Sequence, residues 1–331
     1  MAQINTYRMN LKLYTDYIKK VFREISKLSK ETGYSKTYHL IDYSMALLRH
    51  GCLIRQYTIG NFWKLSNAER SKRLTYPRMC RLMKKYNNSK FIHYLNEKQD
   101  FNSYFKDFIH RDWLEVSKAS YEVFYDFINR HKTIIIKPIN GVEGGGIRKY
   151  IFSGESDLTD LFEKLQSENV LIEECIVQHP KMVFGNTSVN TIRTMTLFGK
   201  DGKGHVVKAM LRAGVGDTVV DNYAMGGSIY EVDVKTGFVV SYGKSKAGDL
   251  HIIHPKTNIV MLGYKIPNWD KVIEISEKAA EHLPQIGIIG WDVAISKDSV
   301  QLIEGNHNPD YELYEYIGST GYYDIFKSIL P

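Results

Sequence analysis

The C-terminal part of the chain contains two apolar runs around a polar turn: Gly290-Trp291-Asp292-Val293-Ala294-Ile295, Ser296-Lys297-Asp298-Ser299 and Gln301-Leu302-Ile303-Glu304-Gly305-Asn306. This pattern predicts a β-hairpin. If the turn centres on Asp298, Asp292 and Glu304 lie opposite each other, and Asn306 lies further along the same face. Two carboxylates and a carboxamide on one face suit Mg²⁺, held with the help of substrate phosphates. The alternative is an ordinary solvated hairpin face.

The composition is that of an ordinary globular protein, with 331 residues, 43% of them hydrophobic and 24% charged. The length predicts two or three packed units. A formal net charge of +7 favours an anionic partner, but it does not choose among nucleotide, acidic sugar, nucleic acid and membrane surface. Many of the basic residues are spread over residues 19–90, without a basic tail. We therefore expect a solvated surface and no nucleic-acid binding.

The cysteines and the N-terminus indicate a compartment. Cys52, Cys80 and Cys175 lie far apart, without metal-ligand spacing, as reduced thiols of a cytosolic protein do. Residues 1–20 lack the apolar core of a signal peptide. No apolar run approaches the length of a transmembrane helix. The sequence therefore predicts a soluble, cytoplasmic protein with no membrane span.

Hydrophobic spacing divides the chain at about residue 90. Residues 8–32 and 37–50 predict amphipathic helices, which end at Gly33 and Gly51. We interpret residues 1–90 as a mainly helical unit. Further along, the predicted helices are 97–107, 117–130, 156–166 and 269–283, the last with Asn268 as N-cap, and the predicted strands are 133–138, 147–152, 169–174, 188–198, 205–212, 227–232 and 237–241. This order predicts an α+β fold with antiparallel sheets.

A glycine-rich segment, residues 140–146, lies between two of these strands. It has neither the Walker A spacing nor the helix that follows a dinucleotide-binding fingerprint. Its backbone N–H groups could still converge on phosphate oxygens, with Lys137 adding a positive charge, although a mobile turn would look the same. Glu173 and Glu174 end an apolar strand, which could contact an adenine and its ribose or could simply be solvated.

Taken in chain order, these segments resemble an ATP-grasp enzyme, and more narrowly the sugar-transfer-associated ATP-grasp family. The wider resemblance rests on Lys98, Lys137-Pro138, Gly141 to Gly146, Glu173-Glu174, Asn190-Thr191-Ile192-Arg193, Leu211-Arg212, Asp221-Asn222 with Gly226-Gly227, Asp292 and Glu304-Gly305-Asn306. The narrower one rests on Ser188-Val189-Asn190-Thr191-Ile192-Arg193, Val220-Asp221-Asn222, Ile266-Pro267-Asn268-Trp269 and Ile289-Gly290-Trp291-Asp292. Together they cover about residues 91–310 and, more loosely, the region of Glu69 and Arg70.

The resemblance implies an ATP-grasp fold, in which two α+β lobes, residues 91–175 and 176–331, grip ATP. Residues 1–90 would be a mainly helical N-terminal extension. The implied nucleotide contacts are Lys98, Lys137, Gly141, Gly144, Gly145, Gly146, Glu173, Glu174, Cys175 and Ile176. The implied ligands of two Mg²⁺ ions, which Mn²⁺ can replace, are Asp292, Glu304 and Asn306. Arg193 and Arg212 would approach the γ-phosphate and an acyl-phosphate, with Asn222 beside the metals.

The activity implied by the resemblance is that of an ADP-forming carboxylate–amine ligase. A carboxylate attacks the γ-phosphorus, and an amine then displaces phosphate from the acyl-phosphate. The partners would be small-molecule carboxylates and amines, free or linked to a nucleotide sugar or a lipid. The family association suggests an acidic sugar or an amino acid in cell-surface polysaccharide synthesis. A phosphotransferase with the same ATP site and a non-catalytic nucleotide-binding scaffold are the alternatives.

Overall fold

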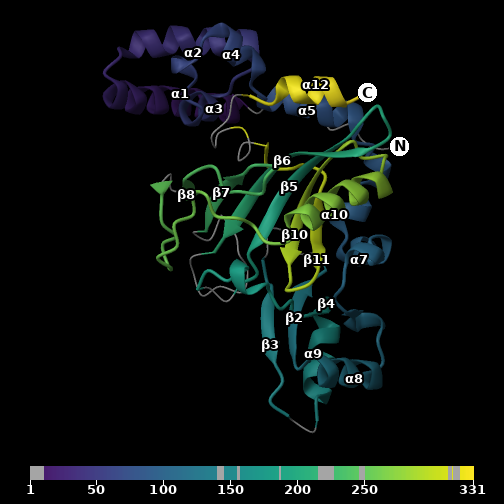
Figure 1. Ribbon diagram of the computed structural model, residues 1–331. Helices are drawn as coiled ribbons and strands as arrows, with labels where there is room; N and C mark the ends of the chain where they lie inside the picture. The colour runs from purple at the N-terminus through teal and green to yellow at the C-terminus, as the bar shows by residue number, and fades with distance from the viewer. Residues whose placement is uncertain are drawn as a thin grey trace. The chain divides into compact units, whose positions relative to one another are not determined.

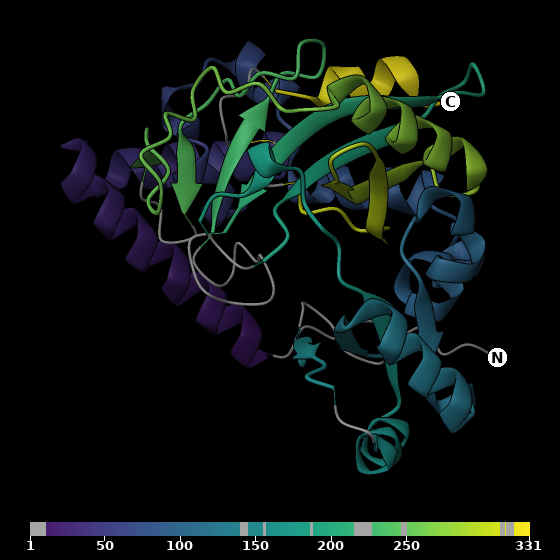
Figure 2. The same ribbon diagram turned by 60° about the horizontal axis from the view of Figure 1, so that its bottom comes forward.

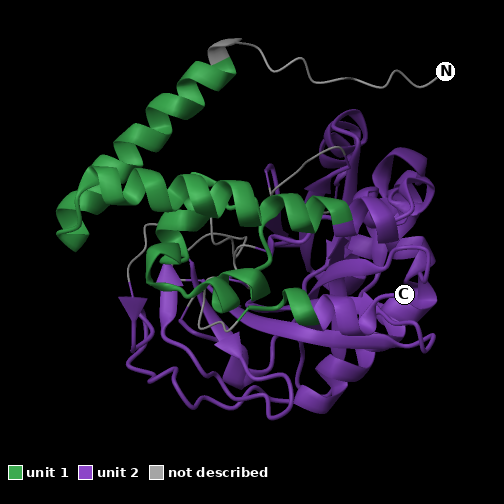
Figure 3. Cartoon of the chain, turned by 90° about the horizontal axis from the view of Figure 1, so that it is seen from above, with its two compact units in different colours: residues 1–81, 319–324 green, residues 82–318, 325–331 purple. Residues whose placement is uncertain are grey.

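The computed structural model describes residues 11–139, 145–154, 157–185, 188–214, 227–245, 250–311, 315 and 321–331. The chain divides into two compact units, which Figure 3 colours separately. The first unit contains residues 1–81 and 319–324, and the second contains residues 82–318 and 325–331. A further division of the second unit at residue 175 stays a prediction.

The first unit is helical. Its elements are α1 (Leu11–Thr32), α2 (Lys36–His50), α3 (Ile54–Ile59), the 3₁₀ turn Phe62–Lys64, α4 (Asn67–Lys72) and α5 (Tyr76–Tyr86), within which the unit boundary falls. The hydroxyl of Ser35 caps the start of α2 by accepting from the Tyr38 N–H, and Gly51 ends the helix at a φ of 67°. The two helices predicted here are confirmed over their described residues.

A buried ion pair lies inside the first unit. Both carboxylate oxygens of Asp42 in α2 accept from the guanidinium of Arg70 in α4, each at 2.9 Å. The hydroxyl of Tyr57 donates to the same carboxylate at 2.8 Å. Because all three side chains are buried, this pair fixes α2, α3 and α4 to one another.

The second unit contains a four-stranded antiparallel sheet in the order β1-β4-β2-β3. Its strands are β1 (Trp113–Glu115), β2 (Thr133–Pro138), β3 (Arg148–Ile151) and β4 (Val170–Glu174). Helices α8 (Tyr121–His131) and α9 (Thr159–Ser167) share a hydrophobic core with this sheet, as Figure 1 shows. The strands predicted around the glycine-rich segment are confirmed, and β1 is a strand that the sequence did not predict.

A second, seven-stranded antiparallel sheet has the order β11-β10-β5-β6-β7-β8-β9. Its strands are β5 (Thr191–Phe198), β6 (Gly204–Ala213), β7 (Ser228–Val232), β8 (Gly243–Ser245), β9 (Leu250–His251), β10 (Ile288–Ile295) and β11 (Val300–Asn306). Helix α10 (Trp269–His282) packs across β5, β6, β10 and β11 on one face (Figure 1, Figure 2). The hydroxyl of Thr194 in β5 contacts Ser276 of α10. Because neighbouring side chains of a strand point to opposite faces, Arg193 points away from α10.

The remaining elements of the second unit are short. They are the 3₁₀ turns Ser89–Phe91, Lys106–Phe108, Val116–Lys118 and Pro180–Met182, with α6 (His93–Asn96), α7 (Lys98–Tyr104) and α12 (Tyr323–Ile329), which begins in the first unit. None of the helices in the described ranges is long and apolar enough to cross a membrane.

One predicted strand was wrong, and the predicted N-cap of α10 makes other contacts than a capping side chain would. Residues 237–241 do not form the predicted strand. Phe238 and Val239 form only isolated bridges, to Lys265 and Val232, after a turn that ends at Gly237 with a φ of 68°. Asn268 occupies the N-cap position of α10, as predicted, but its side chain makes no capping hydrogen bond. It adopts a left-handed conformation, and its amide donates to the carbonyl oxygens of Ser296 and Lys297, each at 3.3 Å. The predicted α+β fold with antiparallel sheets is confirmed.

Candidate active site

The β10–β11 hairpin places the two predicted metal carboxylates opposite each other. Asp292 pairs with Glu304, and Gly290 pairs with Asn306. Nearer the turn, Val293 pairs with Leu302, so Ile303 has no partner in the ladder and forms a bulge. In a regular ladder, Asp292 would face Ile303. The extra residue is therefore what brings the second carboxylate opposite the first.

Two arginines hold Asp292 from neighbouring strands. Arg193 lies opposite it on β5, with Nη2 2.8 Å from Oδ2 and Nε donating to Oδ1. Arg212 on β6 donates through Nη1 to Oδ2 at 2.9 Å. Burial alone would raise the pKa of Asp292, but the two guanidinium charges outweigh it and hold that pKa well below its ordinary value. The group is therefore an anion across the physiological range.

Glu304 is more accessible, with 54% of its side chain exposed, and it lies 3.9 Å from Arg193. The surrounding protein and the nearby Asp292 carboxylate both raise its pKa. The amide Nδ2 of Asn306 is buried and finds no hydrogen-bond partner in the described part of the chain.

These residues fit a hard cation. Within the described ranges no cluster of three or more His, Cys, Asp or Glu side chains is arranged to hold a metal ion. A cation site here would therefore consist of the two facing carboxylates and the Asn306 amide, completed by phosphate oxygens and water. Mg²⁺ commonly binds in that way, and its charge would offset the repulsion between Asp292 and Glu304.

The two predicted phosphate-binding lysines lie close together. Lys98, the first residue of α7, donates from Nζ to the carbonyl oxygen of Ile139 at 3.2 Å. Burial and the positive charge of Lys137 both lower the pKa of Lys98. The two ammonium groups repel each other, and an anion bound between them would reduce this repulsion.

The structure describes part of the glycine-rich segment that follows Lys137. Gly141 and Gly144 lie outside the described residues, as does Asn222. Gly145 and Gly146 form an exposed turn before β3. Gly146 has a φ of +78°, and a Cβ there would lie 2.8 Å from Cγ of Pro138. Glycine is therefore required at this position, for its backbone conformation and for the close approach.

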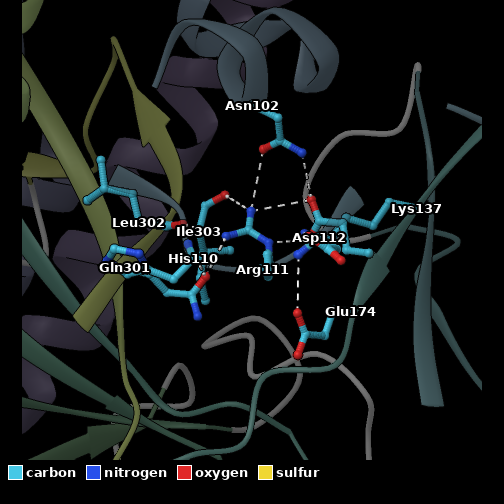
Figure 4. A network of polar contacts seen from close by, with 10 residues as sticks. Asn102, His110, Arg111, Asp112, Lys137, Glu174, Gln301, Leu302 and Ile303 are labelled. Carbon is cyan, nitrogen blue, oxygen red and sulfur yellow. Dashed lines mark hydrogen bonds and ion pairs between the residues drawn. The ribbon is translucent and has the colours of Figure 1, made fainter. Parts of the chain in front are cut away.

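A buried polar network surrounds Arg111 (Figure 4), and Glu173 belongs to it. Glu173 accepts from Asn102 Nδ2 at 3.1 Å, from Arg111 Nε at 2.7 Å and from Lys137 Nζ at 2.5 Å. Burial alone would raise its pKa, but Arg111 and Lys137 outweigh it, and the pKa is well below its ordinary value. A direct contact of this carboxylate with adenine or ribose stays a prediction.

The other residues predicted to frame the nucleotide are less enclosed. Glu174 accepts from the Asp112 N–H at 3.1 Å and keeps 41% of its side chain exposed. The Cys175 N–H donates to the Thr133 carbonyl oxygen at 3.3 Å, and Ile176 is half-buried. Their predicted contacts with adenine and ribose remain predictions.

Sequence reasoning missed Arg111, which is 5% exposed. Besides Glu173 it contacts the Leu302 carbonyl oxygen at 2.6 Å and the Ile303 carbonyl oxygen at 3.3 Å, both on β11. Its partners lie 62 and about 190 positions along the chain, so no local pattern marks this residue.

The chain matches a known protein family over most of its length. The sequence profile of a family described as "Sugar-transfer associated ATP-grasp" matches residues 78–329. No curated protein matches the sequence.

Among solved structures, the ATP-grasp ligase PsnB complexed with minimal precursor, Mg and ADP is 16% identical, with 87% of this chain and 74% of that chain covered and a TM-score of 0.45. In two further PsnB complexes the chain spans only 60% and 61% of the other chain. The D-alanine–D-alanine ligase from Bacillus anthracis complexed with ATP is 12% identical, with 65% and 55% covered and a TM-score of 0.37. These TM-scores are too low to support an argument. The family of the chain is shown by the profile match over residues 78–329.

Proposed function

The chain belongs to the sugar-transfer associated ATP-grasp family, and from this premise we propose that it is an ATP-dependent, ADP-forming ligase that joins a carboxylate to an amine. The observation that carries the proposal is the pairing of Asp292 with Glu304, with the guanidinium groups of Arg193 and Arg212 against Asp292. One site of this kind combines ligands for a cation with positive charges for a transferred phosphoryl group.

We assign the nucleotide contacts to the two lysines. Lys98 and Lys137 bind the phosphates, and the Lys137 ammonium has three N–H donors, so it can reach a phosphate while it keeps its contact with Glu173. Gly145 and Gly146, with the remaining glycines of the segment, close over the triphosphate, while Glu174 and the backbone at Cys175 and Ile176 face the adenine and ribose.

We assign the metal ligands to Asp292, Glu304 and Asn306. When bound there, one or two Mg²⁺ ions, or Mn²⁺ in their place, supply positive charge to the phosphate oxygens. Arg193 and Arg212 hold Asp292 ionised and place two further charges where the transferred phosphoryl group is anionic. Asn222 is proposed to lie beside this group.

The proposed reaction has two steps. An oxygen of the substrate carboxylate attacks the γ-phosphorus, the bond from that phosphorus to the bridging oxygen breaks, and ADP leaves. The amine nitrogen then attacks the acyl carbon, the carbon–oxygen bond to phosphate breaks, and the nitrogen loses one proton. Excluding water protects the acyl-phosphate between the two steps.

The proposed substrate class is supported by the description of the family, which associates that family with sugar transfer. We propose an acidic sugar or an amino acid as the carboxylate, in cytoplasmic steps of cell-surface polysaccharide synthesis. Either substrate could be free, nucleotide-linked or lipid-linked. This part of the proposal rests on the family association and not on the geometry of the site.

The test measures ADP and phosphate released from Mg·ATP, with uronic acids, nucleotide-linked uronic acids and amino acids crossed against a panel of amines. Mass spectrometry follows every mixture. Release that requires both substrates, with a product lighter than their sum by one water, supports the ligase. A stable phosphorylated product without free phosphate would replace the ligase with a phosphotransferase, and absent Mg·ATP binding would contradict both.

A further inference from the structure

The buried Arg111 joins the two sheets of the second unit (Figure 4). On one side it donates to Glu173 of β4, from Nε to Oε2 at 2.7 Å and from Nη2 to Oε1 at 3.3 Å. On the other side it donates to β11, through Nη1 to the Leu302 carbonyl oxygen and through Nη2 to the Ile303 carbonyl oxygen. One planar guanidinium therefore contacts both strands.

The contact with β11 falls on its bulge. Ile303 is the residue without a partner in the hairpin, and Leu302 precedes it. A bulge disrupts the ladder locally, and a buried carbonyl without a donor costs free energy, so the two N–H donors of Arg111 stabilise the bulged geometry. Glu304 is the next residue. Its position opposite Asp292 depends on that bulge.

The contact with β4 acts on Lys137. Glu173 accepts from both Arg111 and Lys137, and Asn102 completes the group. The three charged side chains comprise one carboxylate and two cations, which leaves one positive charge in excess. A buried carboxylate paired with Arg111 thus fixes the Lys137 ammonium without neutralising the pair of cations.

We infer that Arg111 is a positioning residue which sets the phosphate-binding Lys137 and the metal-binding Glu304 in a fixed relation to each other. It acts on Lys137 through Glu173 and on Glu304 through the Leu302 and Ile303 carbonyls. The inference rests on the proposed function, because it assumes that Lys137 and Glu304 bind the nucleotide and its cation. Arg111 itself is not among the residues that we assign to the nucleotide or to the cation.

Lysine cannot replace arginine in this role. A lysine at 111 would keep the charge for Glu173, but its compact ammonium cannot present the planar fork that reaches a carboxylate and two carbonyls together. The variant R111K therefore separates charge from geometry. R111M removes both and leaves the Glu173–Lys137 pair alone.

The test measures, in the full chain, the Kd of Mg·ATP at saturating Mg²⁺ and the Mg²⁺ concentration needed for half-maximal nucleotide binding. We expect R111K and R111M to raise both by roughly 10- to 100-fold, the usual range for outer-shell partners of metal ligands. The matched control is R70M, which breaks the buried Asp42–Arg70 pair of the first unit. It should lower Tm and leave both binding constants unchanged.

A double-mutant cycle distinguishes positioning from general loss of stability. K137M should weaken Mg·ATP binding strongly in the wild-type chain and much less in the R111K background, whereas in the R70M background its effect should be unchanged. R111K with wild-type binding constants would overturn the inference, and so would full additivity with K137M. Failure of the wild-type chain to bind Mg·ATP would instead overturn the proposed function. If R111M does not fold, R111K decides.

Discussion

Asp292 faces Glu304 across the β10–β11 hairpin because Ile303 is left out of the ladder between them. The pairing of Ile295 with Val300 centres the turn between Lys297 and Asp298, and from that register Ile303 would be the residue opposite Asp292. Because of this single unpaired residue, the residue opposite Asp292 is the carboxylate Glu304 and not the apolar Ile303. The bulge lies directly beside the proposed cation site, where such irregularities are over-represented.

The first prediction concerns the cation site. E304Q should lower ligase turnover by about 100-fold or more, because an amide in place of the carboxylate weakens the cation that neutralises the phosphates. The fold should be intact, since 54% of the Glu304 side chain is exposed. Steady-state turnover and thermal unfolding are the measurements. E274Q, in the exposed Glu274–Lys278 pair of α10, is the control and should change neither. Turnover that survives E304Q would contradict the metal assignment.

The hairpin also shows how far sequence reasoning reaches. Centring the turn on Asp298 predicted the correct Asp292–Glu304 pair, although the true centre lies half a position earlier and the bulge makes up the difference. The pair was predictable because both carboxylates stand on strands joined by a short turn. The bulge was not, because the alternation of apolar and polar residues looks the same with or without it.

Contacts between distant segments were beyond the sequence. Arg111 follows no motif, and the reason for its burial lies in Glu173 and in carbonyls of β11, far along the chain. Asn268 is the N-cap residue that its place before a helix predicts, but its amide contacts the turn of the β10–β11 hairpin and does not cap the helix. Local propensity predicted most elements of the fold. The network around the site depends on tertiary contacts that override or bypass it.

The second prediction concerns the acid stability of the second unit. The folded-state pKa of Glu173 lies below its ordinary value, so its stabilising effect is complete above about pH 4.3 and is lost as the pH falls through the folded pKa. E173Q should lower the free energy of unfolding at pH 7 by about 3–5 kcal/mol, because Arg111 loses its buried partner.

Urea unfolding between pH 7 and pH 3 checks this. The difference between wild type and E173Q should shrink on acidification, and a constant difference would show that the pKa of Glu173 is the same in the folded and unfolded chain. D42N, at the buried pair of the first unit, is a comparison with similar burial. It should leave Mg·ATP affinity unchanged, whereas E173Q should weaken it by releasing Lys137.

The third prediction concerns Lys98. K98M should raise the Kd of Mg·ATP by about tenfold, because a nearby ammonium contributes roughly 1–2 kcal/mol to a bound phosphate at a partly exposed site. Calorimetric titration with a non-hydrolysable ATP analogue measures it. K90M, at an exposed lysine of the preceding 3₁₀ turn, should bind like wild type. Equal affinities for wild type and K98M would remove Lys98 from the nucleotide site.

The fourth prediction concerns the turn after Lys137. G146A introduces a Cβ at a φ of +78° and 2.8 Å from Pro138 Cγ, so we expect a loss of about 1–3 kcal/mol in the free energy of unfolding and a weaker nucleotide affinity. G154A is a close control, since Gly154 lies at the other end of β3 with a φ of +102° and no atom within 4 Å of its would-be Cβ.

The two variants share the strain of a positive φ and differ in the contact with Pro138, which adjoins Lys137. If the close approach positions the lysine, only G146A should change the Kd of Mg·ATP, and G154A should lose stability alone. Thermal unfolding and nucleotide titration of both proteins separate these effects. Equal losses of affinity in the two variants would mean that backbone strain anywhere along β3 disturbs the site, and that the contact between Gly146 and Pro138 has no special part in it.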